Sequence, residues 1–477
     1  MTATARDRVL IAGGIVVDVR DGSQRPDTDV LIAGGTIVRV SPAAERPAEP
    51  DAVVVDARGK YLVPGYNDMH AHALGVADAA PGLELMLAHG ITGFRQMAGS
   101  DALLRRRAEG RLSLPAAAPA LLATPGMVLN PANASTSAKA VATIRAQHAA
   151  GADFIKAGMV GREVFFDAQA EALRLGLPIV GHLPAGIDVA KASRRGMKSI
   201  EHLGPGVTLF ACCCDDGEQI RELAAARPGP RLPPFKIPFQ DRILAKLLAK
   251  LVLNPINQST PQSAALFERA LTNFDETLAH PLAERFAADA TWQVPTLIRV
   301  KTQELCDAPG FAEQPGLAYM TPGTRKAWSE AAEKFGTFPE QMRATFTRAY
   351  ELQLRLTKIF DEAGVEMLAG TDSTGAAWVV PGAALHQEFD ELARAGLSAL
   401  RILQMATVRA AQFLGATATM GTIEPEKNAD LVLLTADPTA SVENLHRIAG
   451  VVRAGRYFSQ QDLLSIKDRI AAAHSVW

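Results

Sequence analysis

The chain opens with short apolar runs that are separated by pairs of glycine. The stretches 9–18 and 29–40 are rich in β-branched residues, and Gly-Gly pairs interrupt them at positions 13–14 and 34–35. Turn residues between β-branched runs predict two hairpins. Residues 53–56 predict a further strand. We therefore expect a small sheet layer before residue 60.

From residue 61 short apolar strands alternate with helical stretches, a pattern typical of parallel βα units. Eight such units suggest a TIM-like (β/α)8 barrel, and an open doubly wound sheet is the alternative. The barrel is favoured because polar residues that suit catalysis follow strands across the whole set. The expected strands are 61–63, 91–97, 120–123, 154–157, 178–181, 198–201, 293–298 and 366–370, and the expected helices are 83–89, 102–109, 139–149, 163–175, 189–194 and 330–362.

Two connections in this region are long. Residues 203–292 carry helical patterns at 240–253 and 262–279, and residues 299–365 form the second long piece. Loops of this length usually carry function or an extra subdomain. We expect both insertions to cap the mouth of the barrel, whereas an oligomerisation element is the competing interpretation.

The end of the chain returns to strand character after helical patterns at 384–395 and 398–414. Chain termini often lie close together, so these last strands are expected to join the first ones in one layer. The predicted division is a barrel at 64–418 and a small β-sandwich domain built from 1–63 and 419–477.

Composition narrows the class of protein. Hydrophobic residues make up 48% of the chain and the net charge is −2 without a long basic run, which argues against nucleic acid or an anionic membrane as partner. Neither an apolar span nor an apolar signal core is evident. The four cysteines, three of them contiguous at 212–214, do not form a disulfide framework. A reducing cytoplasm is therefore the expected location.

A His-x-His pair, His70 and His72, follows the apolar run 61–63. Alternate side chains of a strand point the same way, with Cα atoms about 6–7 Å apart, so the two imidazoles can hold one metal ion. A chance pair of surface histidines is the alternative.

Four more polar residues end predicted strands: Lys156, His182, His202 and Asp372. One helix and one strand separate each of the first three from the next, which places them on consecutive strands and at the rim where barrel enzymes build their sites. A bare ammonium is a poor neighbour for metal ligands, but a lysine carbamylated by carbon dioxide is a carboxylate that can bridge two cations. A lysine paired with an acid is the alternative, and either histidine alone could be a core residue.

Together these motifs resemble the amidohydrolase superfamily, in its two-metal type and its imidazolonepropionase-related and prolidase-like branch. The resemblance spans nearly the whole chain and implies a barrel flanked by a β-sandwich-like domain. The matching pieces are Pro64-Gly65-x-x-Asp68-x-His70-x-His72, Gly181-His182-Leu183-Pro184, Ser199-Ile200-Glu201-His202, Ala369-Gly370-Thr371-Asp372-Ser373 and Asn428-Ala429-Asp430-Leu431-Val432-Leu433-Leu434.

By this resemblance two divalent ions share the site, bridged by a hydroxide and by the carbamylated lysine. One ion takes His70, His72 and Asp372, the other takes His182 and His202, and Lys156 lies between them. Imidazole and carboxylate ligands suit zinc, with manganese or cobalt as alternatives. Asp372 is expected to move the proton from the hydroxide to the leaving group, and His202 is the second residue expected to act in catalysis.

The predicted function is hydrolysis of a carbon–nitrogen bond in a small amide, peptide-like or carbamate substrate. The alternatives are a hydrolase of cyclic amides or of aryl-amide or phenylurea xenobiotics, and a catalytically inactive binding protein on the same scaffold. A homo-oligomer is expected by analogy.

Three residues are candidate substrate contacts. Arg299 could bind a carboxylate of the substrate, and a surface salt bridge is the alternative. Tyr319 and Trp378 could cover an aromatic group. Cys306 and the three contiguous cysteines are expected to be small buried residues, with lining of a pocket as the alternative, and His386 is expected to be structural.

Overall fold

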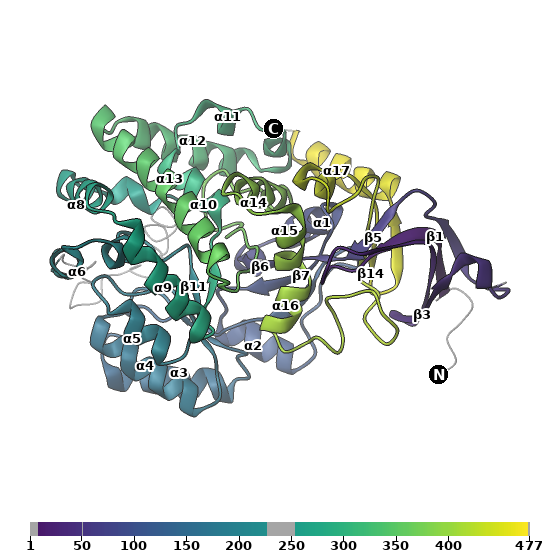
Figure 1. Cartoon of the computed structure of the whole chain (residues 1–477), viewed down its shortest axis with the longest axis horizontal. Coiled ribbons are helices and arrows are strands. Elements are labelled where there is room, and N and C mark those ends of the chain that lie inside the picture. Colours follow the sequence, from purple (N-terminus) through teal and green to yellow (C-terminus); the bar gives the residue numbers. More distant parts are fainter. Residues whose placement is uncertain (1–7, 50, 227–252, 476–477) are drawn as a thin grey trace.

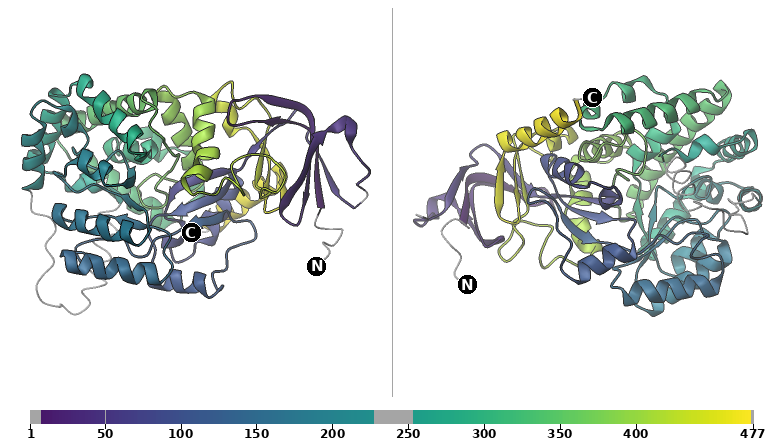
Figure 2. Two further views of the ribbon diagram at one scale, coloured as in Figure 1. Left: turned by 60° about the horizontal axis from the view of Figure 1, so that its bottom comes forward. Right: turned by 180° about the vertical axis from the view of Figure 1, so that it is seen from behind.

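The computed structural model describes residues 8–49, 51–226 and 253–475. A sheet that uses both ends of the chain lies at one end of the molecule, and a larger body of helices and parallel strands forms the rest (Figure 1). The same arrangement is seen from two other directions in Figure 2. Within the described ranges, no helix has the length and apolar character needed to cross a membrane.

The terminal sheet has eight strands in the order β15-β14-β13-β5-β1-β2-β3, with β4 paired to β1. Strand β5 lies between β1, to which it is parallel, and β13, to which it is antiparallel. The prediction that strands from both ends of the chain share one layer is therefore confirmed. The strands are β1 Arg8–Val17, β2 Gln24–Ala33, β3 Thr36–Pro42, β4 Val53–Asp56, β5 Tyr61–Pro64, β13 Leu431–Leu434, β14 Ile448–Arg453 and β15 Arg456–Ser459.

The two Gly-Gly pairs behave differently. Gly34 and Gly35, with φ of 58° and 80°, make the predicted tight turn between β2 and β3. The first pair was predicted as a turn as well, but Gly13 and Gly14 lie inside the single strand β1, where the pairing with β2 shifts register. A Cβ at Gly14 would lie 2.3 Å from Cδ1 of Leu62. This pair therefore permits a bulge and a close approach of β5.

The prediction that residues 61–63 form the first strand of the barrel is wrong, because these residues form β5 of the terminal sheet. The first strand of the parallel set is β6 (Tyr66–Ala71), in which every residue is buried. Gly65 joins the two strands, and a Cβ there would lie 2.0 Å from Oγ1 of Thr92. A short apolar run indicates a strand but not the sheet that it joins, which explains the error.

The remaining strands form two parallel sheets, one of β6, β7 (Ile91–Gln96) and β8 (Ala120–Ala123), and one of β9 (Ile155–Ala157), β10 (Ile179–Gly181), β11 (Met197–Glu201) and β12 (Trp292–Val294). Single parallel bridges link Leu129 with Ala157, Gln293 with Met367 and Ala71 with Ser373. The α/β class is thus as predicted. The segment 366–373 runs between β12 and β6.

Helices pack along the outside of these strands (Figure 1). The predicted helix 398–414 is two helices, α15 and α16, which separate at Thr407, where φ is −130° and ψ is −93°. The helices outside the insertions are α1 Ala80–Ala88, α2 Asp101–Ala108, α3 Ser137–Ala149, α4 Arg162–Arg174, α5 Val189–Arg194, α14 Ala383–Arg394, α15 Ala399–Ala406, α16 Val408–Phe413 and α17 Gln460–Ser475, with short turns η2 Ala43–Glu45, η3 Ala73–Gly75 and η7 Val442–His446.

The first insertion is helical. The predicted helix 262–279 is two helices, because Asp275 caps a new one by accepting a hydrogen bond from the backbone of Thr277 at 2.8 Å. The predicted helix 240–253 lies, apart from its last residue, outside the described residues. The described elements are η4 Phe210–Cys213, α6 Gly217–Ala225, η5 Pro255–Gln258, α8 Pro261–Thr272 and α9 Glu276–Ala288.

The second insertion begins earlier than predicted. Strand β12 ends at Val294, and Thr296, with φ of 47°, leads into helix α10 instead of continuing the predicted strand to residue 298. The predicted helix 330–362 is interrupted before Pro339, which precedes α13 and has no N–H for a continuing helix. The elements are α10 Leu297–Glu304, α11 Pro309–Ala312, η6 Pro315–Tyr319, α12 Pro322–Gly336 and α13 Glu340–Glu362.

Candidate metal centre

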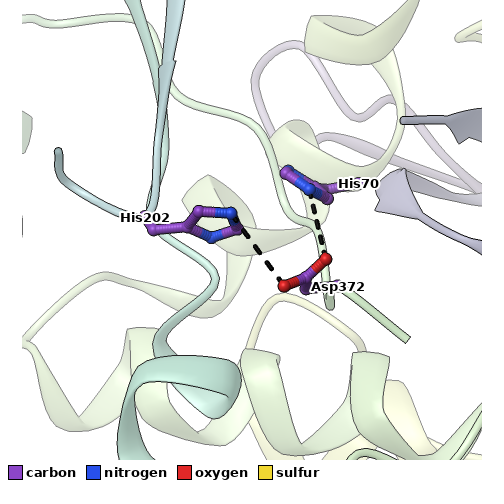
Figure 3. Close-up of side chains that lie close together, drawn as sticks. All are labelled: His70, His202 and Asp372. Atoms are coloured by element: carbon purple, nitrogen blue, oxygen red, sulfur yellow. Dashed lines mark ion pairs between the residues drawn. The ribbon is translucent and has the colours of Figure 1, made fainter. Parts of the chain in front are cut away.

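The carboxylate of Asp372 is the point at which three histidines meet. Its Oδ1 lies 2.8 Å from Nε2 of His72 and 3.3 Å from Nε2 of His70. Its Oδ2 lies 4.0 Å from Nε2 of His202. In Figure 3, dashed lines join this carboxylate to the rings of His70 and His202, which come from two different segments. One ligand atom from each of His70, His202 and Asp372 falls within 4.8 Å of the others, so these three can share one ion.

The backbone brings these residues together at the carboxyl ends of the parallel strands. The carbonyl of His70 accepts a hydrogen bond of 2.6 Å from the backbone N–H of Asp372. His202 follows β11 directly. Asp372 and His202 have φ of 60° and 58°, a left-handed conformation that is uncommon outside glycine and clusters at functional sites.

His182 and Lys156 complete the group. The ring centroid of His182 lies 5.2 Å from that of His202. Lys156 lies on β9 and is 3% exposed. Gly181, on the adjacent β10, leaves room for its stem, since a Cβ there would be 3.0 Å from Cδ of Lys156. The structure thus brings all six predicted ligands to one end of the parallel strands.

Partners at Nδ1 orient two of the rings. Nδ1 of His70 lies 2.6 Å from Oε2 of Glu201, and Nδ1 of His202 lies 2.6 Å from Oγ1 of Thr296. In both rings Nε2 is therefore left to face Asp372. Histidine ligands of metals are commonly held in this way by a hydrogen bond at the second nitrogen.

The unsatisfied imidazole nitrogen of His70 fits a cation. Nε2 of His70 is buried and has no hydrogen-bond partner among the described residues, and the same is true of Nζ of Lys156, which could join a metal site only after losing its positive charge. Leaving buried polar groups unpaired is costly. Three imidazole nitrogens and a carboxylate are a donor set that zinc and similar divalent ions prefer. The residues present therefore suit a metal ion.

Burial is a main cause of the pKa shifts of the residues in this site. Burial and then the nearby Lys156 lower the pKa of His70, and burial followed by Arg299 places the pKa of His202 well below its usual value, so both rings are neutral, as metal ligation requires. Burial lowers the pKa of Lys156 to about 8. Burial alone would raise the pKa of Asp372, but Arg299 and then His72 hold it well below the usual range.

Asp68, from the motif around the His-x-His pair, ties β6 to the segment that carries Asp372. Its Oδ2 accepts a hydrogen bond of 2.6 Å from the hydroxyl of Thr371. Its Oδ1 accepts from the backbone N–H groups of His70 and Thr371, each at 3.1 Å. Burial raises the pKa of Asp68 to about 7. Asp68 thus fixes the spacing of two ligand-bearing segments.

The three candidate substrate residues occupy different places. Arg299, on the first turn of α10, is only 9% exposed, and its Nε is ion-paired with Oδ2 of Asp372, so this is a buried ion pair. Trp378 donates to the carbonyl of Cys306 at 3.0 Å and lies nearly parallel to the ring of Phe311. Tyr319 is half-buried beside α17. The substrate roles of Trp378 and Tyr319 stay predictions.

The cysteines and His386 match the simpler hypotheses. All four cysteines are free; three are buried and Cys212 is half-buried. Burial raises the pKa of each thiol, so none is an activated thiolate. His386 is buried on α14, with Nε2 2.9 Å from the carbonyl oxygen of His89.

Sequence reasoning missed the residues that support the site. Glu201, Arg95 and Thr296 were not singled out as functional, although Glu201 stood inside a quoted motif. The available signal was a charge within an apolar strand, at Arg95 in β7 and at Glu201 in β11, because a strand buried on both sides rarely carries an unpaired charge.

Comparison with known proteins supports the resemblance. The model of the amidohydrolase family matches residues 353–457, which confirms the resemblance to that family. No curated protein matches the chain by sequence. Among solved structures, bottromycin amidohydrolase is similar at a TM-score of 0.71 and 24% identity, over 98% of this chain and 92% of that one.

Two further solved structures are similar over almost their whole length. A putative prolidase from Bifidobacterium longum matches at a TM-score of 0.58 and 19% identity, over 97% of this chain and 99% of that one. Molinate hydrolase matches at a TM-score of 0.55 and 16% identity, over 96% of this chain and 95% of that one. At these identities the likeness shows a shared TIM-barrel-like α/β fold.

Proposed function

We propose that the chain is a metal-dependent hydrolase that cleaves a carbon–nitrogen bond in a small amide, peptide-like or carbamate substrate. One observation carries this proposal: the Asp372 carboxylate faces Nε2 atoms of three histidines at the carboxyl ends of parallel strands, with Lys156 and His182 beside them. The amidohydrolase family match and the hydrolase names of the structural neighbours support it.

We also propose that the parallel strands close into a complete (β/α)8 barrel, comprising residues 64–418, with residues 1–63 and 419–477 as the second domain. The bridges of Leu129 to Ala157, Gln293 to Met367 and Ala71 to Ser373 support closure, because they connect the edges of the two sheets. In a closed barrel the loops after the strands surround one site. The two long insertions would then cover it.

Two divalent ions, most suitably zinc, would occupy the site. His70, His72 and Asp372 would hold one, and His182 and His202 the other. When bound, such ions lower the pKa of water toward neutrality and polarise a scissile carbonyl. The buried, acceptor-free Nζ of Lys156 favours a carbamylated lysine between them, because a carbamate turns an unpaired buried cation into a bridging carboxylate.

The chain's own residues then have separate tasks. Asp372 accepts a proton from the attacking water and passes it to the leaving nitrogen when the C–N bond breaks. His202 is the second residue proposed to act in catalysis. Two of the imidazole rings are held by hydrogen-bond partners at Nδ1, so their Nε2 atoms keep a fixed direction. Arg299 is ion-paired with the same carboxylate and would bind a carboxylate group of the substrate. The net charge of −2 favours a small molecule over a nucleic acid or an anionic membrane as the partner.

Metal analysis tests the proposal. We expect one to two zinc ions per chain after expression with zinc and bicarbonate, and loss of activity on chelation. A screen of N-acyl amino acids, dipeptides, anilides, phenylureas and cyclic amides, scored for amine release or ring opening, identifies the substrate class. Far less than one ion per chain after zinc supplementation would support the inactive binding protein instead.

The free cysteines support a cytoplasmic location. We also propose that the chain forms a homo-oligomer, which light scattering tests.

A further inference from the structure

A buried ion pair lies directly behind His70. Oε2 of Glu201 is 2.6 Å from Nδ1 of His70, and Oε1 accepts hydrogen bonds from Nη2 of Arg95 at 3.0 Å and from the hydroxyl of Ser199 at 2.6 Å. Glu201 and Arg95 both have no exposed surface. Neither residue has been given a task in the proposed reaction.

Arg95 forms hydrogen bonds with two groups next to the same histidine. Its Nε donates to the carbonyl oxygen of Met69, the residue before His70, at 2.6 Å. The rings of Phe413 and Phe154 lie 4.9 and 5.6 Å from its guanidinium carbon, which fixes the side chain in place. The guanidinium therefore anchors the backbone that carries His70 and also the carboxylate that contacts its ring.

A buried ion pair is weak evidence for stability, since desolvation of two charges offsets their attraction. The geometry offers a more specific use. A carboxylate can only accept, so the contact of 2.6 Å requires the proton of a neutral His70 to sit on Nδ1. Nε2 is then a free lone pair, and it is the atom that faces Asp372.

We propose that Arg95 and Glu201 are positioning residues that fix the tautomer and the ring orientation of His70 for a cation. The proposal rests on the proposed metal-dependent function. Arg95 acts through Glu201: its Nη2 compensates the buried negative charge from 3.0 Å at Oε1 and 3.3 Å at Oε2, while Oε2 makes its shortest contact with the imidazole. The neutral Thr296 hydroxyl at His202 can donate or accept, so it does not impose a tautomer in the same way.

The substitution Glu201→Gln separates positioning from packing because it keeps the shape. In this variant the amide oxygen must serve the two donors Arg95 and Ser199, so the amide NH2 faces Nδ1 of His70. That NH2 donates to Nδ1 and moves the ring proton to Nε2, where it blocks the ligand atom. We expect zinc affinity to fall by about 10–100-fold, as when outer partners of metal ligands are removed.

The experiment uses the full chain and two readouts. Competition with a chromophoric chelator gives the zinc dissociation constant, and ¹⁵N NMR of histidine-labelled, metal-free protein reports the tautomer of His70. The matched control is Glu391→Gln, another buried carboxylate in an ion pair, with Lys301, which is expected to keep wild-type zinc affinity. Wild-type affinity and an Nδ1-protonated His70 in Glu201→Gln would overturn the proposal.

A double variant tests whether the ion pair has a purely structural role. Arg95→Met with Glu201→Met removes both charges, leaves no buried ion unpaired and leaves no acceptor at Nδ1 of His70. If the pair only stabilises the fold, this variant binds zinc like the wild type once it is folded; if the pair positions His70, the affinity stays low. Should Glu201→Gln fail to fold, the double variant and Arg95→Lys decide the question by the same readouts. A wild-type protein that binds no zinc would refute the hydrolase proposal, whereas the NMR tautomer would still test this one.

Discussion

The guanidinium of Arg299 is ion-paired with Oδ2 of Asp372, the carboxylate expected to ligate a metal and to move a proton. The same carboxylate contacts His72 through its other oxygen at 2.8 Å. The positive charge of Arg299 therefore balances Asp372. Under the proposed function metal ions would share that role, and Arg299 would be available to an anionic group of the substrate.

Replacing Arg299 with Met is expected to raise KM for substrates that carry a free carboxylate by about 10- to 100-fold, since a buried charge-assisted hydrogen bond is lost. Substrates without a carboxylate should keep their KM. Steady-state kinetics on an N-acyl amino acid and on the matching amide give the comparison. Equal effects on both substrates would show that Arg299 supports Asp372 and does not contact the substrate.

The substitution Asp372→Asn should leave the fold intact and lower kcat by at least about 10³-fold, because the amide can neither accept the proton nor balance the metal charge. Turnover and circular dichroism measure the two effects. Asp390→Asn is a suitable control, since this half-exposed carboxylate pairs only with His446 among the ion pairs of the described residues. Near-normal turnover in Asp372→Asn would remove Asp372 from proton transfer.

Trp378 offers a test of the predicted aromatic contact. Trp378→Phe loses the hydrogen bond to the carbonyl of Cys306 and should cost about 1 kcal/mol of unfolding free energy. Trp328, whose ring centroid is 5.9 Å away, gives the control substitution Trp328→Phe. If Trp378 only packs in the insertion, both variants keep KM. A raised KM in Trp378→Phe alone would instead assign this ring to the substrate.

Glu304 gives a pH-dependent stability. Burial raises its pKa from 4.5 to about 8 in the folded protein. The folded state thus holds a proton that the unfolded chain releases above pH 4.5, so the stability from this group is complete below pH 4.5 and is lost as the pH rises toward 8. Over this range the contribution of Glu304 to the unfolding free energy falls by at most about 1.4 kcal/mol per pH unit.

Chemical denaturation between pH 5 and pH 8 checks this expectation in the wild type and in Glu304→Gln. The variant keeps an acceptor for the side chain of Gln353, which donates to Oε1 of Glu304 at 3.1 Å, but it has no titrating proton. Its unfolding free energy should therefore fall less steeply over this range. Parallel curves for the two proteins would contradict the raised pKa.

The grouping of the candidate ligand residues was predictable from sequence because strand ends leave a simple signature. His182, His202 and Asp372 each follow a short apolar run, and the strand-to-rim rule for α/β proteins places such residues together without knowledge of any loop. Lys156 was recognisable for a similar reason. The terminal sheet followed from its β-branched runs and turn residues.

Other features were beyond the reach of periodicity. Residues 61–63 look like any apolar strand, and only the pairing of β5 with β1 and β13 shows which sheet they join. The helix at 330–362 was predicted without a break because its apolar spacing continues across Pro339. The partners of His70 and His202 were missed since Glu201 and Thr296 act through contacts between residues distant in sequence, at separations of 131 and 94.

The place of β5 between β1 and β13 has a consequence for biosynthesis. Its N-terminal neighbour emerges from the ribosome early, whereas its other neighbour is made more than 360 residues later. Until then one edge of β5 stays open while the adjoining β6 already carries the first histidine of the candidate metal centre. The nascent chain must therefore keep an unpaired strand from aggregating, and assembly of the layer must wait until translation is nearly complete.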